Sequence, residues 1–141
     1  MSWLKWFEPQ YVAPWTKTNS LTHGYVTRFI CWEPIFFFGG EWFKGNEKIY
    51  PRTRMHDVFD YPIGERDFGH PCPKPSSLWV AFLEDYTVDS AIVLDPFLGS
   101  GTTLVACERL NRIGRGVEIS PAYCAVAIQR LVDMGLEAEL I

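Results

Sequence analysis

The sequence is poor in cysteine, and its cysteines are widely spaced. Cys31, Cys72, Cys107 and Cys124 form no Cys-x-x-Cys pair, which argues against a zinc knuckle and against a disulfide scaffold. No apolar run approaches the roughly 18 residues that span a bilayer, and the N-terminal residues do not have the layout of a signal peptide. These absences predict a cytoplasmic protein with no metal site and no contact with a membrane.

Positive charge is scarce too. The 141 residues include 13 Lys and Arg against 17 Asp and Glu, a net charge of −4, so the chain is not basic overall. The exception is the stretch 43–54, where four basic residues accompany the single acid Glu47. It could meet DNA phosphates or be an ordinary solvated loop. The four basic residues are Lys44, Lys48, Arg52 and Arg54.

The remaining composition predicts one soluble globular domain with two unlike parts. Apolar residues make up 48% and charged residues 21% of the chain, as in ordinary globular proteins. Residues 1–69 are rich in aromatics, proline and glycine, which predicts short strands and long loops, with strands at 12–15 and 33–38.

Residues 70–141 show alternating helix and strand patterns, which predict a parallel α/β unit. The predicted order is a helix starting at Ser76 or Ser77, a buried strand at 91–94, a helix at 102–110 ended by Asn111, a strand at 116–119, and a helix opened by Ser120 and Pro121 that runs to about Met134.

A glycine loop, Asp-Pro-Phe-Leu-Gly-Ser-Gly-Thr-Thr at 95–103, joins the first of these strands to the next helix. It contains no lysine, which excludes a phosphate-binding P-loop, and Leu104 stands where a dinucleotide-binding loop needs a small residue. A ligand with ribose and adenine but no phosphate fits better, and S-adenosylmethionine is such a ligand. Asp95 could then meet its ammonium group and Glu118, 23 positions later, its ribose hydroxyls. Alternatively, both acids only cap helices.

Three sequence elements in order resemble the C-terminal part of DNA amino-methyltransferases, in the permuted class whose cofactor motif is C-terminal. They are His-Pro-Cys-Pro-Lys-Pro at 70–75, the glycine loop with its strand, and Gly-Val-Glu-Ile-Ser-Pro-Ala-Tyr at 116–123. The resemblance implies an α/β, Rossmann-like class I methyltransferase fold, here a partial sheet with helices on both faces. It also implies binding of S-adenosylmethionine and double-stranded DNA, and a role in DNA methylation of the restriction-modification type.

By the same resemblance, the cofactor would be lined by residues of all three elements. Lys74, a cation, could pair with the cofactor carboxylate or be a surface lysine, and His70 could be a turn residue instead. The residues implied are His70, Pro71, Lys74, Pro75, Asp95, Pro96, Phe97, Gly99, Ser100, Gly101, Thr102, Glu118, Ile119 and Ser120.

The Pro-Pro motif with which this family holds the target amine is absent, because none of the ten prolines are adjacent. The sequence therefore predicts one partial methyltransferase domain over 1–141, with no catalytic residue of its own. Residues 1–69 would supply late strands and possible DNA-facing loops, and 70–141 the cofactor-binding part. The amine-binding loop could come from a second chain in a split enzyme or from an upstream reading frame. A homodimer is a further possible assembly. Alternatively, the chain is an inactive cofactor-binding or DNA-associated remnant. An RNA or small-molecule methyltransferase is disfavoured by the 70–75 element.

Overall fold

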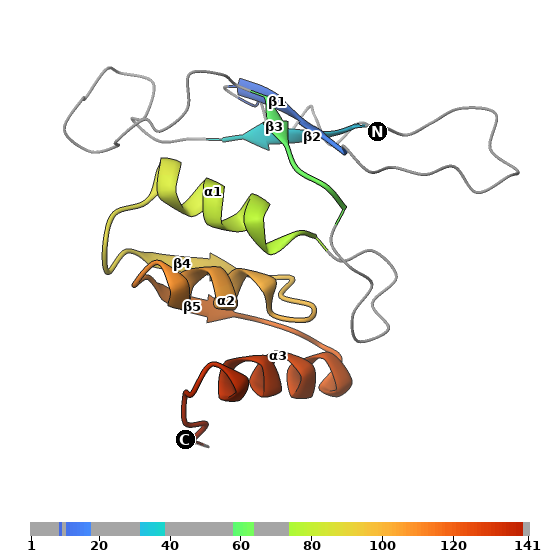
Figure 1. Cartoon of the computed structure of the whole chain (residues 1–141). Helices are drawn as coiled ribbons and strands as arrows, with labels where there is room; N and C mark the ends of the chain where they lie inside the picture. Colours follow the sequence, from blue (N-terminus) through green and yellow to red (C-terminus); the bar gives the residue numbers. More distant parts are fainter. Residues whose placement is uncertain (1–8, 10, 18–31, 39–57, 64–73, 140–141) are drawn as a thin grey trace, which may run out of the picture. The chain divides into compact units, whose positions relative to one another are not determined.

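The computed structural model describes residues 9, 11–17, 32–38, 58–63 and 74–139. The chain divides into two compact units, residues 1–63 and 64–141. Their helices and strands are coloured blue to green in the first unit and yellow-green to red in the second (Figure 1). None of the helices in the described ranges is long and apolar enough to cross a membrane.

The first unit contains a three-stranded sheet of β1 (Tyr11–Thr16), β2 (Trp32–Phe37) and β3 (Phe59–Asp60), in the order β2-β1-β3. β1 pairs antiparallel with β2 and parallel with β3. Ala13, Trp15 and Phe59 are buried, and the Trp15 indole donates a 2.9 Å hydrogen bond to the Tyr61 carbonyl. The strands predicted at 12–15 and 33–38 are confirmed. β3 was not predicted, because two residues are too few for a pattern.

The second unit alternates helix and strand as predicted. Its elements are α1 (Ser76–Tyr86), β4 (Ile92–Asp95), α2 (Thr102–Arg109), β5 (Ile113–Gly116) and α3 (Pro121–Asp133). β4 and β5 are parallel, with Ile92 opposite Ile113 and Asp95 opposite Gly116. Asn111 takes the predicted left-handed conformation after α2, at φ 56°.

The core of this unit lies between α1, α2 and one face of β4. Leu83, Ala106 and Cys107 are buried there, and Val93 of β4 packs against them. Burial raises the pKa of the Cys107 thiol, while nearby Arg112 lowers it and Asp95 raises it further. The thiol therefore stays protonated to higher pH and packs as a small apolar group.

Two details of the second unit differ from the sequence predictions. Among the described residues of the second unit, the strand predicted as buried is covered on the face of Val93, where α1 and α2 pack, whereas Ile92 is 71% and Leu94 66% exposed. The second strand occupies 113–116, not 116–119. Helix α1 begins at Ser76, directly after Pro75, which confirms the predicted start.

Two glycines explain why the position of the second strand, β5, was predicted wrongly. A Cβ at Gly114 would lie 2.5 Å from Leu104 Cδ2 on α2, and a Cβ at Gly116 would lie 2.6 Å from Leu98 Cδ2. The strand therefore requires glycine where helix and loop approach it, and glycine weakens the sequence signal of a strand.

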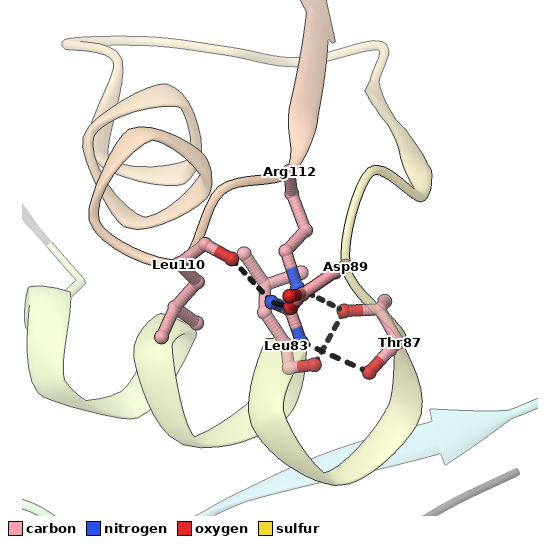
Figure 2. Close-up of polar contacts among 5 residues, drawn as sticks. All are labelled: Leu83, Thr87, Asp89, Leu110 and Arg112. Atoms are coloured by element: carbon pink, nitrogen blue, oxygen red, sulfur yellow. Dashed lines mark hydrogen bonds and ion pairs between the residues drawn. The ribbon is translucent and has the colours of Figure 1, made fainter.

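Hydrogen bonds from Arg112 connect the segments at the end of the sheet where β4 and β5 begin (Figure 2). Its guanidinium donates to the Thr87 hydroxyl and carbonyl at 3.0 and 3.1 Å, to Asp89 Oδ1 at 2.6 Å and to the Leu110 carbonyl. The Thr87 hydroxyl in turn donates to the Leu83 carbonyl at the end of α1. One side chain thus joins the two turns that lead into the parallel strands. The glycine loop lies at the opposite end of the sheet, where β4 ends.

Candidate functional site

The glycine loop leaves the carboxyl end of β4 and enters α2. Gly99 and Gly101 have φ values of 57° and 80°, a left-handed conformation that costs glycine little and other residues more. The Gly101 amide donates to the Leu98 carbonyl at 3.1 Å, and Gly101 is the cap residue of α2. The two glycines thus let the loop turn tightly at the positive end of the α2 dipole.

Asp95 ends β4, as predicted, and is fixed by the loop that follows it. One carboxylate oxygen accepts the Phe97 amide at 3.0 Å, and the other accepts the Thr103 hydroxyl at 2.6 Å. The contact with Thr103, which the sequence did not suggest, spans from the strand to the first turn of α2. Both oxygens retain unused lone pairs, since a carboxylate can accept about four hydrogen bonds.

Glu118 lies two residues beyond the end of β5, and not within the strand as the predicted range 116–119 implied. Its carboxylate accepts the Gly99 amide at 2.8 Å and the Ser120 amide at 2.8 Å. It thereby joins the glycine loop to the turn that begins α3. Two acids from neighbouring parallel strands consequently converge on one loop, an arrangement suited to a ligand with hydroxyl or ammonium donors.

Solvent-exposed apolar side chains lie close in sequence to these two acids. Phe97 is 88% and Ile119 97% exposed, and Val117 is 59% exposed. Each of the two most exposed side chains lies one or two positions from an acid of the site. An aromatic ring and an aliphatic side chain left open next to fixed polar groups suit a flat, partly apolar ligand such as adenine. The residues present thus fit S-adenosylmethionine.

Helix α3 supports the loop from a position that the sequence did not reveal. A Cβ at Gly101 would lie 2.7 Å from the Ala127 Cβ, so the loop lies directly against this helix. Arg130, one turn further, donates from Nη1 to the Ser100 carbonyl at 2.8 Å and to the Thr102 hydroxyl at 3.2 Å. No local sequence motif predicts this role of Arg130, because its hydrogen-bond partners lie about 30 positions earlier in the chain.

The remaining predicted residues fall into two groups. Lys74 and the buried Pro75 directly precede α1, Pro96 is exposed in the loop, and Ser120 lies at the N-cap position of α3 without a side-chain cap bond; their contact with a ligand stays a prediction. His70, Pro71 and the basic residues Lys44, Lys48, Arg52 and Arg54 lie outside the described residues. Over the ranges that the structure describes, no three His, Cys, Asp or Glu side chains gather as a metal site would require.

Sequence comparison links this site to DNA-modifying enzymes. A family model described as DNA methylase, for N6 and N4 methyltransferases, matches residues 40–129. The Type II methyltransferase M.HpaI of Haemophilus parainfluenzae is 28% identical over 140 residues, which cover 92% of this chain and 44% of that protein. M.HindIII of Haemophilus influenzae is 42% identical over 76 residues, covering 53% and 25%. The chain therefore spans less than half the length of these relatives.

Solved structures give the same result for the fold. The M1.HpyAVI–SAM complex superposes with a TM-score of 0.67 at 25% identity, covering 89% of this chain and 62% of that one. The cytosine-N4-specific PvuII DNA methyltransferase superposes with a TM-score of 0.64 at 20% identity, covering 89% and 52%. These likenesses confirm the predicted α/β, Rossmann-like fold class.

Proposed function

Because this chain belongs to the DNA methylase family, we propose that it binds S-adenosylmethionine for methylation of the exocyclic amine of adenine or cytosine in double-stranded DNA. The observation that carries the proposal is the convergence of Asp95 and Glu118 on the glycine loop. A solved relative of the same fold, M1.HpyAVI, is a SAM complex.

Each part of the site has a partner on the cofactor. Asp95 would accept from the ammonium group and Glu118 from the ribose hydroxyls, while the α2 N-terminus and Lys74 would face the carboxylate. Phe97 and Ile119, both largely exposed, would cover the adenine. When bound, S-adenosylmethionine supplies an electrophilic methyl group, and this chain's residues orient it.

The groups that receive the target base would come from polypeptide outside these 141 residues. Methylating an exocyclic amine requires a flipped base whose nitrogen is held by acceptors, and the sequence contains no Pro-Pro pair to hold it. The face of β4 that the described residues of the second unit leave exposed, with Ile92 and Leu94, supports this proposal, since parallel sheets are normally covered on both faces. A second chain or a longer polypeptide could supply both the loop and the cover.

Titration calorimetry tests the cofactor site. We expect the chain to bind S-adenosylmethionine, and we expect Asp95→Ala and Glu118→Ala each to weaken binding tenfold or more, about 1.4 kcal/mol. Glu108→Ala is the matched control, because it removes the same charge from an exposed position on α2. An absence of binding by the unmodified chain would contradict the proposal.

Transfer of a radiolabelled methyl group to duplex DNA tests the missing half of the site. With this chain alone we expect no detectable transfer to either base, even when the cofactor is bound. Clear transfer would show that these 141 residues contain their own amine-binding groups. Binding without transfer is also what a cofactor-binding remnant would show, so the assay is repeated with the polypeptide encoded beside this chain. Restored transfer identifies a split enzyme.

A further inference from the structure

Helix α3 reaches the glycine loop through two residues one turn apart. Ala127 is 3% exposed and lies against Gly101. Arg130, three positions later and therefore on the same side of the helix, donates from a single nitrogen, Nη1, to three acceptors. These are the Ser100 carbonyl at 2.8 Å, the Ser100 hydroxyl at 3.4 Å and the Thr102 hydroxyl at 3.2 Å.

The acceptors lie where the loop has most conformational freedom. Ser100 stands between Gly99 and Gly101, both in the left-handed region, and glycine on both sides allows the intervening peptides many other orientations. Ser100 and Thr102 are 8% and 9% exposed, so water has little access to replace the bonds that Arg130 makes. A charge-assisted bond to the Ser100 carbonyl therefore selects one orientation of this peptide.

The charge has a second effect at this position. The first turn of α2 carries no acidic residue, so the helix does not neutralise its own positive end. The Arg130 guanidinium, bonded to Ser100 and Thr102, adds positive potential there, which favours an anionic group at the mouth of the loop. The fixed conformation of the loop and the positive potential both favour binding of the carboxylate-bearing end of the cofactor.

From this geometry we infer that Arg130 is a positioning residue for cofactor binding, which holds the loop at Ser100 and Thr102 in the shape that receives the methionyl part of S-adenosylmethionine. The inference rests on the proposed function and adds α3 to the site. Arg130 acts through the loop, so its removal should weaken ligands that have the methionyl carboxylate more than ligands that lack it.

Calorimetry with two ligands tests this specificity in the full chain. We expect Arg130→Met to weaken S-adenosylmethionine binding about tenfold, and binding of 5′-methylthioadenosine, which has no carboxylate, less than threefold. Arg130→Lys should stay within about threefold of the unmodified chain for both ligands, because one donor nitrogen makes all three bonds. Arg109→Met is the matched control, since it removes a positive charge from an exposed position of α2. Equal losses for both ligands, or no rescue by lysine, would overturn the inference.

Amide hydrogen exchange provides a measurement that does not require the cofactor. Arg130→Met should speed exchange in residues 98–105 relative to Arg109→Met, while residues 76–86 of α1 keep their rates. Unchanged exchange in the loop would overturn the inference even if cofactor binding fell. If the unmodified chain binds no S-adenosylmethionine, the proposed function fails, and loop exchange alone then shows whether Arg130 holds the loop.

Discussion

Gly101 meets two separate requirements at one position. Its φ of +80° is costly for residues with a side chain, and a Cβ there would lie 2.7 Å from the Ala127 Cβ. We expect Gly101→Ala to lower the free energy of unfolding by about 2 kcal/mol or more, combining left-handed strain of about 1 kcal/mol with overpacking of about 1 kcal/mol or more. Urea denaturation measures the change.

Gly135 offers a matched control for that prediction. Its φ is +91°, yet a Cβ there would have no heavy atom within 4 Å. Gly135→Ala should therefore show only the strain, about 1 kcal/mol. If both substitutions destabilise the chain equally, the close approach of α3 to the loop does not contribute and only the backbone conformation matters.

The site residues differ in how far the sequence could predict them. Asp95 and Glu118 were predicted because each lies within a short local motif: Asp95 follows an apolar run, and Glu118 stands in Gly-Val-Glu-Ile-Ser. Arg130 and Thr103 were not, because their roles depend on contacts across 28 to 30 positions and across 8 positions. A lone arginine on an amphipathic helix carries no local sign that its guanidinium points at a loop instead of solvent.

At the level of elements, β4 has two faces with different surroundings. Val93 packs against the core between α1 and α2, whereas Leu94 is 66% exposed. Val93→Thr, which places a hydroxyl in an apolar site at nearly constant volume, should lower the free energy of unfolding by about 1 kcal/mol or more. Leu94→Thr should change it by less than about 0.5 kcal/mol. Chemical denaturation of both variants measures the difference.

The two substitutions control for each other, because both place the same β-branched residue in one strand. Equal losses would mean that the Leu94 face is covered in the isolated chain. A smaller loss for Leu94→Thr than for Val93→Thr would instead show that the Leu94 face is exposed in the isolated chain, where the polypeptide that completes the domain can pack.

Elements were predictable where composition and geometry agree. The apolar runs that became β1, β2 and β4 combine β-branched or aromatic residues with polar or glycine-containing ends, so their strands were placed within a residue. β5 was shifted by three positions, because Gly114 and Gly116 are required by contacts with Leu104 and Leu98. Such contacts form only after folding, and a sequence pattern does not contain them.

At the scale of the whole molecule, three motifs in order were enough to predict the fold class. The glycine loop and the 116–123 motif each specify a turn and a helix start after a strand, the 70–75 motif precedes a helix, and their order restricts the connections between parallel strands. The covering of each sheet face was not predictable, since an all-apolar strand such as β4 looks the same whether one or both faces are covered.

The net charge of −4 makes DNA binding depend on local positive charge. If Lys44, Lys48, Arg52 and Arg54 each contact a phosphate, the logarithm of the binding constant should fall against the logarithm of salt concentration with a slope of about −3.6, from about 0.9 per contact. Arg52→Ala with Arg54→Ala should then reduce the slope by about 1.8. Fluorescence anisotropy with a labelled duplex over a salt series measures it.

Arg109→Ala with Arg115→Ala is the matched control, since it removes two exposed charges of the same kind from the second unit. It should leave the slope nearly unchanged, because a slope counts the phosphates contacted and not the total charge. If both double variants lower the slope equally, binding follows net charge and the 43–54 stretch has no special role. If the unmodified chain shows no affinity for duplex DNA at low salt, that stretch is a solvated loop, and the DNA contacts belong to the polypeptide that supplies the amine-binding groups.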